Sequence, residues 1–300
     1  MRAHARLVKP NHRELIVSAD DFGLSLEVNE AIECAHRDGI LRAASLMVGS
    51  SQATDAVERA RRLPALRVGL HLVLVNGRPL LSPGQLPDLV EADGCFPTDL
   101  GKAGMRYFFR RGAREQLEAE IRAQFEAFAR TGLLLDHVNA QNHMHVHPTI
   151  LGLILRVGSE FGMRAVRVPR EPFFASWSAT RDDFGGRLAN AVLLWPWLTL
   201  MEMRLKRAGL QTNDFVFGMN DSGRMTTCRV RALVRRLPPG ISEMYFHPAT
   251  KSWPGIEPAI ENYAFAGELA ALTSPEVAGT LREAGVTPVA FTDLVERRAA

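Results

Sequence analysis

Two adjacent carboxylates, Asp20 and Asp21, follow a short apolar run at residues 15–17 and precede a glycine at position 23. Like charges held side by side cost free energy unless a cation or a shared proton stabilises them. Such a pair suits metal-assisted chemistry, in which one carboxylate holds the ion and the other moves a proton. The structural alternative is a turn whose aspartates cap the helix that follows.

Most of the histidines lie in three segments that are apolar and strand-like or that follow such a run. Six of the nine histidines are found there: His71, His137, His143, His145, His147 and His247. Neutral imidazole is the commonest protein ligand of metal ions, although a single histidine in an apolar strand is more often a core residue. Together with the aspartate pair, these segments predict a metal site.

The chain resembles the YdjC-like carbohydrate deacetylases, and among them the branch associated with hopanoid biosynthesis. The segments that carry the resemblance are residues 18–25, 69–74, 136–140, 143–145, 167–172 and 245–250. The resemblance implies a divalent-metal-dependent hydrolase that removes acetyl groups from N-acetylated amino sugars. In the hopanoid branch the implied substrate is an N-acetylglucosamine carried on a bacteriohopanepolyol lipid. The implied fold is a single-domain, distorted TIM-like (β/α) barrel with parallel strands.

The resemblance also implies a set of metal ligands. They would be drawn from Asp21, His71, Gln141, His143 and His145. Family members commonly carry a histidine at the position of Gln141, and an amide oxygen suits a hard cation better than it suits zinc. We therefore expect one divalent ion, either Mg, Mn, Zn or Co, with the third ligand open between Gln141 and the neighbouring histidines.

Amide hydrolysis needs a polarised carbonyl, an activated water and a protonated leaving amine. The resemblance assigns the general base to Asp20 and leaves Asp21 as a ligand, although the two roles can be exchanged. His247 is the candidate general acid, because imidazole titrates near neutral pH. The candidate substrate-binding residues are Arg167, Arg170 and Asn139, with surface solvation as the alternative for the two arginines.

The candidate residues lie in a chain whose strand and helix signals alternate. Strands are predicted at residues 16–19, 44–48, 68–74, 133–139, 166–168, 244–246 and 289–291, and helices at 25–38, 55–62, 115–131 and after residue 148. Repeated β-α units favour a parallel sheet, and such folds build active sites at the carboxyl ends of their strands. Residues 76–112 are predicted to form a long irregular loop of the kind that serves as a lid.

Length and composition set broad limits. With 300 residues, 46% of them hydrophobic, the chain can form one large domain or two smaller ones, and the resemblance favours one domain over residues 1–300. A net charge of +3 without a basic stripe argues against nucleic acid as a partner. Three separated cysteines and a basic start without an apolar signal-peptide core predict a cytoplasmic protein. A lipid-linked substrate would extend this to the inner membrane face, and a homodimer remains open.

An apolar insertion at about residues 188–210 contains a segment, 191–201, that is apolar apart from one threonine. This segment is shorter than the roughly 20 residues that a transmembrane helix needs. Pro196 is expected to interrupt it. Trp195 and Trp197 lie beside a basic stretch, which predicts peripheral contact with a membrane or with a lipid tail. The alternative is a buried helix of the domain.

Three functions stay open. The first is the metal-dependent de-N-acetylase, acting on a lipid-linked sugar or on a soluble N-acetylated oligosaccharide. The second is a catalytically impaired sugar- or lipid-binding protein, which the glutamine at position 141 suggests. The third is another metal hydrolase such as a phosphoesterase, which the lack of further carboxylate clusters disfavours. Motifs of serine hydrolases and of nucleotide-binding enzymes are absent from the sequence.

Overall fold

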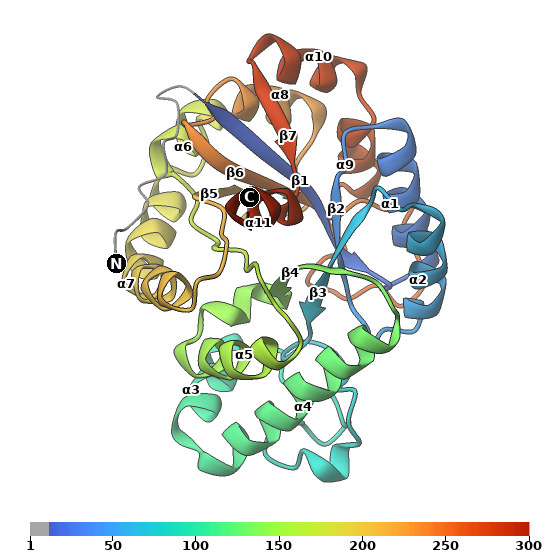
Figure 1. Cartoon of the computed structure of the whole chain (residues 1–300), viewed down its shortest axis with the longest axis vertical. Coiled ribbons are helices and arrows are strands. Elements are labelled where there is room, and N and C mark those ends of the chain that lie inside the picture. The colour runs from blue at the N-terminus through green and yellow to red at the C-terminus, as the bar shows by residue number, and fades with distance from the viewer. Residues whose placement is uncertain (1–11, 300) are drawn as a thin grey trace.

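A parallel sheet of seven strands forms the centre of the structure, a computed structural model that describes residues 12–299 (Figure 1). The strands run in the order β4–β3–β2–β1–β6–β5, and β7 pairs with the first half of β1. Their bounds are β1 Arg13–Phe22, β2 Ala43–Leu46, β3 Arg67–Leu72, β4 Leu135–Ala140, β5 Phe215–Phe217, β6 Gly240–Phe246 and β7 Val286–Val289. In β1, three consecutive apolar residues from 15 to 17 are buried, which is typical of a parallel strand covered on both faces.

Residues 165–170 span the open side of this sheet. Val166 pairs with Val138 of β4, and Ala165 pairs with Gln211. The Val216 amide of β5 donates to the Arg170 carbonyl at 2.9 Å. The strands therefore form a distorted half-barrel whose gap is bridged by short pairings, and the parallel α/β fold predicted from the sequence is confirmed.

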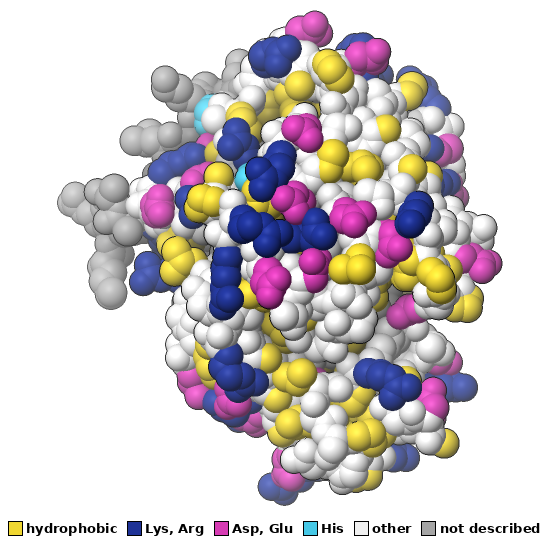
Figure 2. Space-filling view, turned by 90° about the vertical axis from the view of Figure 1, so that its right-hand side faces the viewer, with side chains coloured by type: hydrophobic (Ala, Val, Ile, Leu, Met, Phe, Trp, Pro, Cys, Tyr) yellow, Lys and Arg dark blue, Asp and Glu magenta, His cyan; other side chains and the backbone are white. Residues whose placement is uncertain are grey.

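Helices cover the outside of the sheet (Figure 1). Their bounds are α1 Leu26–Asp38, α2 Ala53–Arg62, α3 Leu100–Phe109, α4 Arg111–Arg130, α5 Pro148–Glu160, α6 Phe173–Thr180, α7 Phe184–Arg207, α8 Thr227–Val234, α9 Phe265–Leu272, α10 Pro275–Glu283 and α11 Phe291–Ala299, with short 3₁₀ turns η1 Pro83–Gln85 and η2 Gln141–Val146. Ser25 caps α1 as predicted, because its hydroxyl oxygen accepts the Val28 amide. On the face built by α1 and α2, basic and acidic side chains are interleaved (Figure 2), for example Arg59 with Glu33 and Asp55.

The last helix, α11, closes the end of the barrel where the strands begin. Phe291 and Leu294 of α11 pack against Ile16 of β1 and Ile241 of β6 in a small separate core. The start of α11 is fixed by Asp136 of β4, whose Oδ1 accepts the Thr292 amide at 2.7 Å. The opposite end of the barrel, where the strands finish, is therefore the end available for a site.

Replacing Asp136 with Asn is expected to weaken the dependence of the free energy of unfolding on pH under acidic conditions. Burial by itself raises the pKa of Asp136, but hydrogen bonds from His137 and Thr292 hold that pKa below its usual value. A carboxyl group with a lowered folded pKa stabilises the fold above its unfolded pKa, and this stabilisation is lost as the pH falls through the folded value. Wild-type unfolding free energy should therefore fall from about pH 5 downward, and that of the variant should fall less. Urea unfolding at stepped pH measures this, with Asp38→Asn as an exposed control; equal slopes would refute the assignment.

The predicted irregular loop at residues 76–112 is only partly irregular. It contains η1, all of α3 and the first residues of α4. Asp99 caps α3 by accepting the Lys102 amide, and Tyr107 anchors the helix by donating its hydroxyl to the Leu74 carbonyl at 2.8 Å. The prediction failed because two glycines within α3 weaken its helical signal, whereas tertiary burial of Ala103 and Tyr107 stabilises it.

Several boundaries differ from prediction, and two of the differences have a clear physical cause. The last strand, predicted at residues 289–291, is β7 and ends at Val289, and Phe291 already begins α11 because Asp293 accepts the Ala290 amide at 2.8 Å. Pro196 does not interrupt the apolar segment, since α7 runs through it without a break. Proline has no N–H to donate to the Val192 carbonyl. Both Pro196 and Val192 are exposed, so water can satisfy that carbonyl.

Within residues 12–299, no helix has the length and apolar character that crossing a bilayer requires.

Candidate functional site

The sequence-predicted residues Asp20, Asp21, His71 and His247 meet where the strands end. Asp20 and Asp21 are among the last three residues of β1, His71 is the next-to-last residue of β3, and His247 directly follows β6. His71 is paired in register with Asn139 of β4. The carboxyl ends of parallel strands meet at one edge, and the parallel order explains why residues so distant in sequence converge here.

Asp20 is buried and held by charge-assisted hydrogen bonds. The Arg167 guanidinium donates from Nη1 to Asp20 Oδ2 at 2.5 Å and from Nη2 to Oδ1 at 3.0 Å. Asn139 Nδ2 adds a third donor to Oδ1 at 3.2 Å. Burial alone would raise the pKa of Asp20, but the positive charge and hydrogen bonds of Arg167 hold it well below its usual range. Asp20 is therefore a fixed, oriented anion.

Arg167 connects Asp20 to a second buried carboxylate, Glu243 of β6. Arg167 Nε donates to Glu243 Oε2 at 3.0 Å, and Nη2 donates to Oε1 at 2.7 Å. The Ser18 hydroxyl also donates to Glu243 Oε1, at 2.6 Å. Glu243 and Ser18 are absent from the sequence prediction. A signal for them exists, because Ser18 and Asp20, like Glu243 and Tyr245, are spaced by two and so face the same side of their strands.

Asp21 departs from the regular geometry of the strand. Its φ angle of 64° is left-handed, and the pairing of β1 with β2 shifts register between Ala19 and Phe22. Asp21 Oδ1 lies 3.5 Å from His71 Nε2. Burial raises the pKa of Asp21 to about 6, opposed by His71 and reinforced by the negative charge of Asp20. The two neighbouring carboxylates therefore lie in different environments, with Asp20 held by Arg167 and Asp21 beside His71.

The hydrogen bonds of His71 fix its tautomer. Asn139 uses its amide nitrogen for Asp20 and for the Ser45 hydroxyl at 3.0 Å, so its amide oxygen faces His71 Nδ1 at 2.7 Å. That oxygen only accepts, and the hydrogen of the neutral ring must therefore be on Nδ1. His71 Nε2 then presents a lone pair toward Asp21, the arrangement found in metal-binding histidines. Asn139 is fully buried behind the site, with its amide committed to protein partners.

The segment after β4 contains the remaining ligand candidates. Gln141 Nε2 donates to the Asn76 carbonyl at 3.2 Å, while its Oε1 is buried with no hydrogen-bond partner among the described residues. His143, in a left-handed conformation with φ of 53°, places Nε2 3.1 Å from the Tyr245 hydroxyl and leaves Nδ1 buried without a partner in the same part of the chain. Burial, and then the charge of Arg167, lower the pKa of His143 to about 3, so the ring is neutral.

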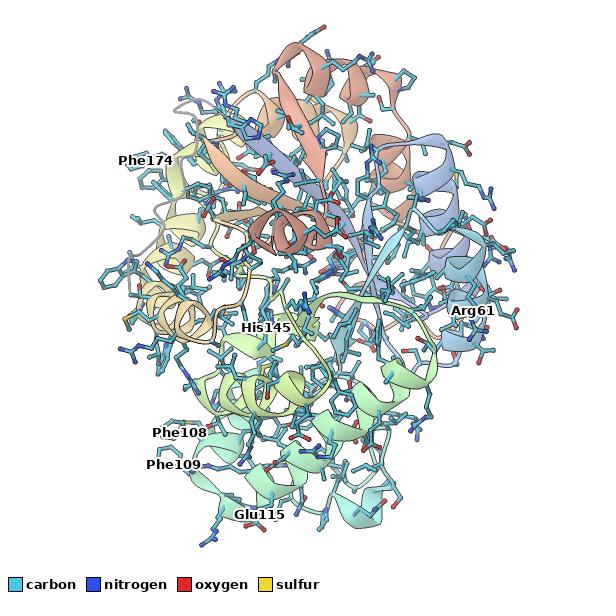
Figure 3. All side chains as sticks on the ribbon, in the orientation of Figure 1. Arg61, Phe108, Phe109, Glu115, His145 and Phe174 are labelled. Atoms are coloured by element: carbon cyan, nitrogen blue, oxygen red, sulfur yellow. The ribbon has the colours of Figure 1, made fainter. Side chains whose placement is uncertain are left out.

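His145 differs from its neighbours because both ring nitrogens are already used. Nδ1 accepts the Ala140 amide at 3.1 Å, and Nε2 donates to the Arg167 carbonyl at 3.1 Å. Figure 3 shows His145 inside the molecule, close to the ends of the strands. The ring fastens the start of η2 to the strand-like segment that carries Arg167. In this arrangement it offers no lone pair to an ion.

Asp21 and His71 form the start of a possible site for a divalent ion. Among residues 12–299, no group of three or more His, Cys, Asp and Glu side chains is close enough to hold a metal. Asp21 and His71 supply two donors, and their 3.5 Å separation is near the roughly 3.4 Å expected between two ligands of one tetrahedral ion. Gln141 Oε1 and His143 Nδ1, which are buried without a partner among the described residues, are candidates for a third donor, and His143 would have to move to join the pair. A carboxylate and an imidazole, together with an amide oxygen or a second imidazole, fit a divalent cation.

His247 follows β6, at the same end of the sheet as the other candidate residues. Its backbone amide donates to Glu268 Oε2 at 2.6 Å, and its ring packs between Tyr245 and Tyr263 at centroid distances of 5.5 and 5.2 Å. Its Nδ1 is buried and has no partner in the described part of the chain. Glu268, which fixes the position of His247 from α9, is absent from the sequence prediction, and no local pattern points to it.

Two loops meet beside Gln141. Asn76, which accepts from Gln141, donates from Nδ2 to Glu257 Oε2 at 2.5 Å. Burial, and then the negative charge of Asp21, raise the pKa of Glu257. The long loop after β3 and the loop after β6 thus join at the edge of the site, and Glu257 is a further carboxylate that faces it.

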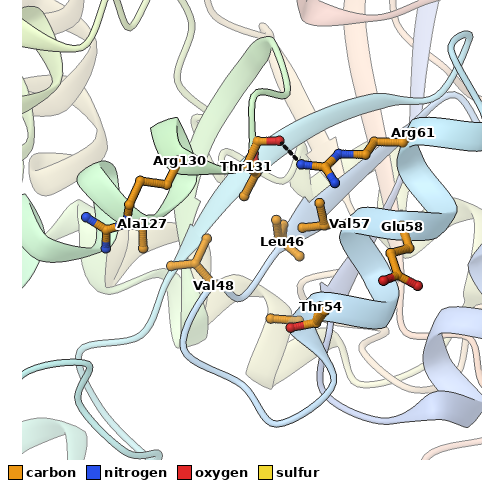
Figure 4. A pocket seen from close by; sticks show the side chains of 10 residues that line it. Leu46, Val48, Thr54, Val57, Glu58, Arg61, Ala127, Arg130 and Thr131 are labelled. Carbon is orange, nitrogen blue, oxygen red and sulfur yellow. Dashed lines mark hydrogen bonds between the residues drawn. The ribbon is translucent and has the colours of Figure 1, made fainter.

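Other predicted residues lie elsewhere. Arg170 does not join Arg167; its Nε donates to Glu202 of α7 at 2.5 Å near the surface. Trp195 and Trp197 are exposed on α7. A cavity of about 280 Å³ between α2 and α4 (Figure 4) is also separate from the cluster, and Arg61 crosses it to donate to the Thr131 carbonyl at 2.8 Å.

Comparison with known proteins identifies relatives of this chain. A carbohydrate deacetylase from Brevibacillus brevis is 38% identical over 171 residues, which cover 57% of this chain and 64% of that protein. A carbohydrate deacetylase from Vibrio vulnificus is 36% identical over 197 residues, covering 63% of this chain and 73% of the relative. The match thus spans less than two thirds of the Brevibacillus protein.

Two solved structures share the fold. A proposed cellobiose-phosphate cleavage protein from Enterococcus faecalis superposes with a TM-score of 0.73 at 22% identity, covering 94% of this chain and 99% of the other. A lactam utilization protein from Thermus thermophilus gives a TM-score of 0.50 at 14% identity, covering 92% and 99%. The family model described as YdjC-like protein matches residues 14–283. The chain therefore belongs to the YdjC-like protein family.

Proposed function

We propose that this protein is a carbohydrate de-N-acetylase that hydrolyses the acetamide of an N-acetylated amino sugar. The observation that carries the proposal is the continuous network from Arg167 through Asp20 and Asn139 to His71 and Asp21. It holds one oriented carboxylate beside a carboxylate–imidazole pair, as metal-assisted amide hydrolysis requires. The relatives named carbohydrate deacetylase support the same class.

The residues divide the chemistry among them. A divalent ion held by Asp21 and His71, with Gln141 or His143 as a third donor, would polarise the acetyl carbonyl and lower the pKa of its water. Asp20 is ionised and fixed by Arg167, and its role is to accept the proton of the attacking water. His247 donates a proton to the leaving amine.

The geometry favours Asp20 over Asp21 as the base. Both oxygens of Asp20 accept hydrogen bonds from Arg167 or Asn139, which orients the carboxylate but leaves it little freedom to bind an ion. Asp21 faces the free lone pair of His71 Nε2 and has no comparable donors among residues 12–299. We therefore keep Asp21 as the ligand.

For the substrate, we propose an N-acetylglucosamine on a bacteriohopanepolyol lipid, with a soluble N-acetylated oligosaccharide as the alternative. The lipid-linked substrate is supported by the resemblance of residues 167–172 and 245–250 and by the apolar surface of α7. The test is acetate release from each substrate after EDTA treatment, with Mg, Mn, Zn or Co added back singly. Metal-restored release from the lipid substrate alone would support the proposal, and faster release from the oligosaccharide would favour the alternative.

A catalytically impaired binding protein is the second candidate, and Gln141 is the observation that favours it. If the glutamine prevents metal binding, a folded sample will bind the sugar without releasing acetate under any metal condition. The same add-back experiment separates the two functions, because the enzyme requires both turnover and its loss with EDTA.

Replacing Gln141 with His is expected to raise zinc affinity by roughly tenfold or more, because imidazole is the better zinc ligand. Gln141 Oε1 is buried and unpartnered among residues 12–299, so a ring at this position would face the same space. Calorimetric titration with zinc measures the change, and Asn142→His, one residue along the same turn, is the matched control. Equal affinities for wild type and Gln141→His would place Gln141 outside the ligand set.

A further inference from the structure

One helix has an unusual outer surface. On α7, the exposed fractions are 63% for Val192, 69% for Leu193, 60% for Trp195 and 46% for Trp197; these four residues are termed the α7 face. Between Arg187 and Glu202 the sequence of α7 contains no charged residue. Other large apolar side chains exposed on α6 and α7 are Phe174, Phe184, Leu188 and Met203.

The α7 face is not the side that packs on the protein. Leu198, Met201 and Leu205 are buried, and their spacing of three and four residues defines the inner stripe of the helix. An ordinary surface helix would be polar opposite that stripe. Here the opposite side is apolar over several turns, which marks an interaction surface rather than a solvated one.

The inner side of α7, opposite the α7 face, packs near the candidate site. α7 packs against η2, the turn that carries Gln141 and His143, and also against α5 and α6. Figure 3 shows Phe174 of α6 projecting outward on the side of the molecule that α7 occupies in Figure 1. A partner bound to the outer side would therefore be separated from the turn that carries Gln141 and His143 by the width of α7.

Basic side chains lie at both ends of the α7 face. The acidic residues of this stretch include Glu202, which is paired with Arg170, and Asp183, which caps α7 by accepting the Gly186 amide. Lys206 and Arg207 are exposed at the end of α7, and neither forms an ion pair within residues 12–299. Arg181 is exposed in the turn between α6 and α7, with its guanidinium over the Trp177 ring at 5.1 Å. Of the nearby carboxylates, Asp182 is paired with Arg187 and Arg229. An apolar centre with tryptophans and free basic residues at its ends complements an anionic lipid surface.

We propose that the α7 face docks flat on an anionic lipid bilayer, with Trp195 and Trp197 at the headgroup level and Lys206 and Arg207 on the anionic lipids. Tryptophan favours this depth because its ring is apolar and its indole N–H remains in contact with water. The inference does not rest on the proposed function, since it concerns binding to a bilayer that contains no sugar.

The experiment is co-sedimentation of the full chain with vesicles of phosphatidylcholine, with and without phosphatidylglycerol. Wild type should bind the anionic vesicles, and the Trp195→Ser, Trp197→Ser double variant should bind them roughly tenfold more weakly or worse. Lys206→Glu, Arg207→Glu should lose the preference for phosphatidylglycerol. Leu134→Ser is the matched control, because Leu134 is 82% exposed before β4, away from α7, and should bind like wild type.

Three results would overturn the proposal: wild type that sediments with neither vesicle, a tryptophan double variant that binds like wild type, or a Leu134→Ser variant weakened as much as the double variant. Light scattering adds a fourth. If the α7 face instead covers a second copy of the chain, wild type will be a dimer without lipid and the double variant a monomer. Circular dichroism establishes that each variant is folded; the mutated side chains are exposed and should leave the fold intact.

Discussion

Replacing Asp20 with Asn is expected to reduce acetate release by about 10²–10⁴-fold while leaving metal affinity nearly unchanged. Asparagine keeps the shape of Asp20 but cannot accept the proton of the attacking water. The proposed metal ligands, Asp21 and His71, keep their side chains in this variant, and their Oδ1 and Nε2 atoms lie 3.5 Å apart. The measurements are steady-state acetate release and calorimetric metal titration on the same preparation.

The two aspartates make this experiment decisive. If Asp20→Asn loses the metal and Asp21→Asn retains it, the roles of base and ligand are reversed. Asp38→Asn, an exposed aspartate at the end of α1, is the control for general effects of the substitution. Because Asp20 also contacts Arg167, thermal unfolding must accompany the assay to separate lost chemistry from lost structure.

Replacing Arg167 with Met is expected to lower the free energy of unfolding by about 3–5 kcal/mol. Arg167 is fully buried and donates to two carboxylates, Asp20 and Glu243, which are buried as well. Methionine fills much of the space but leaves the two carboxylates without a cationic partner in a poorly solvated interior. Urea unfolding at neutral pH measures the loss.

The cost should come from the unpaired carboxylates rather than from a lost contact area. The triple variant Arg167→Met, Asp20→Asn, Glu243→Gln should therefore recover roughly half or more of the lost stability, because replacing a whole buried ion cluster is often near neutral. Arg167→Lys should be intermediate, since lysine keeps the charge but loses the forked geometry. A triple variant no more stable than Arg167→Met alone would contradict this account.

The buried ion cluster explains how the fold supports the proposed chemistry. Arg167 both stabilises Asp20 as an anion and fixes its direction, and Glu243 with Ser18 fixes Arg167 in turn. Asn139 connects the same carboxylate to His71, so the base and one ligand share a single support. A change in any of these positions should reach the reacting groups without touching substrate.

Much of this arrangement could be predicted from the sequence. The apolar runs and helical stripes predict a parallel α/β fold, and that fold brings strand ends together whatever the details of packing. Asp20, Asp21 and His247 follow or end such a run and His71 lies within one, and the parallel topology accounts for their convergence. A deacetylase as the function still rests on the family resemblance, because the residues by themselves indicate only a metal site.

The supporting residues were harder to predict, because several are joined to their partners across long stretches of sequence. Ser18 and Glu243 are separated by 225 residues, and Arg167 and Asp20 by 147. The period-two spacing of Ser18 with Asp20, and of Glu243 with Tyr245, was present but is easily missed inside runs that are otherwise apolar. Glu268 has no such signal, since only the packing of α9 brings it to His247.

Tertiary structure alone decided which of several similar residues acts in the site. Arg167 and Arg170 look equivalent in the sequence, yet an offset of three along an extended segment turns them to opposite sides, one toward Asp20 and one toward Glu202. His143 and His145 are equally plausible ligands until hydrogen bonds from Ala140 and to the Arg167 carbonyl occupy both nitrogens of His145. Sequence fixes which chemical groups are present near the strand ends, whereas hydrogen-bond partners, which depend on the register of distant strands, determine which lone pairs stay free.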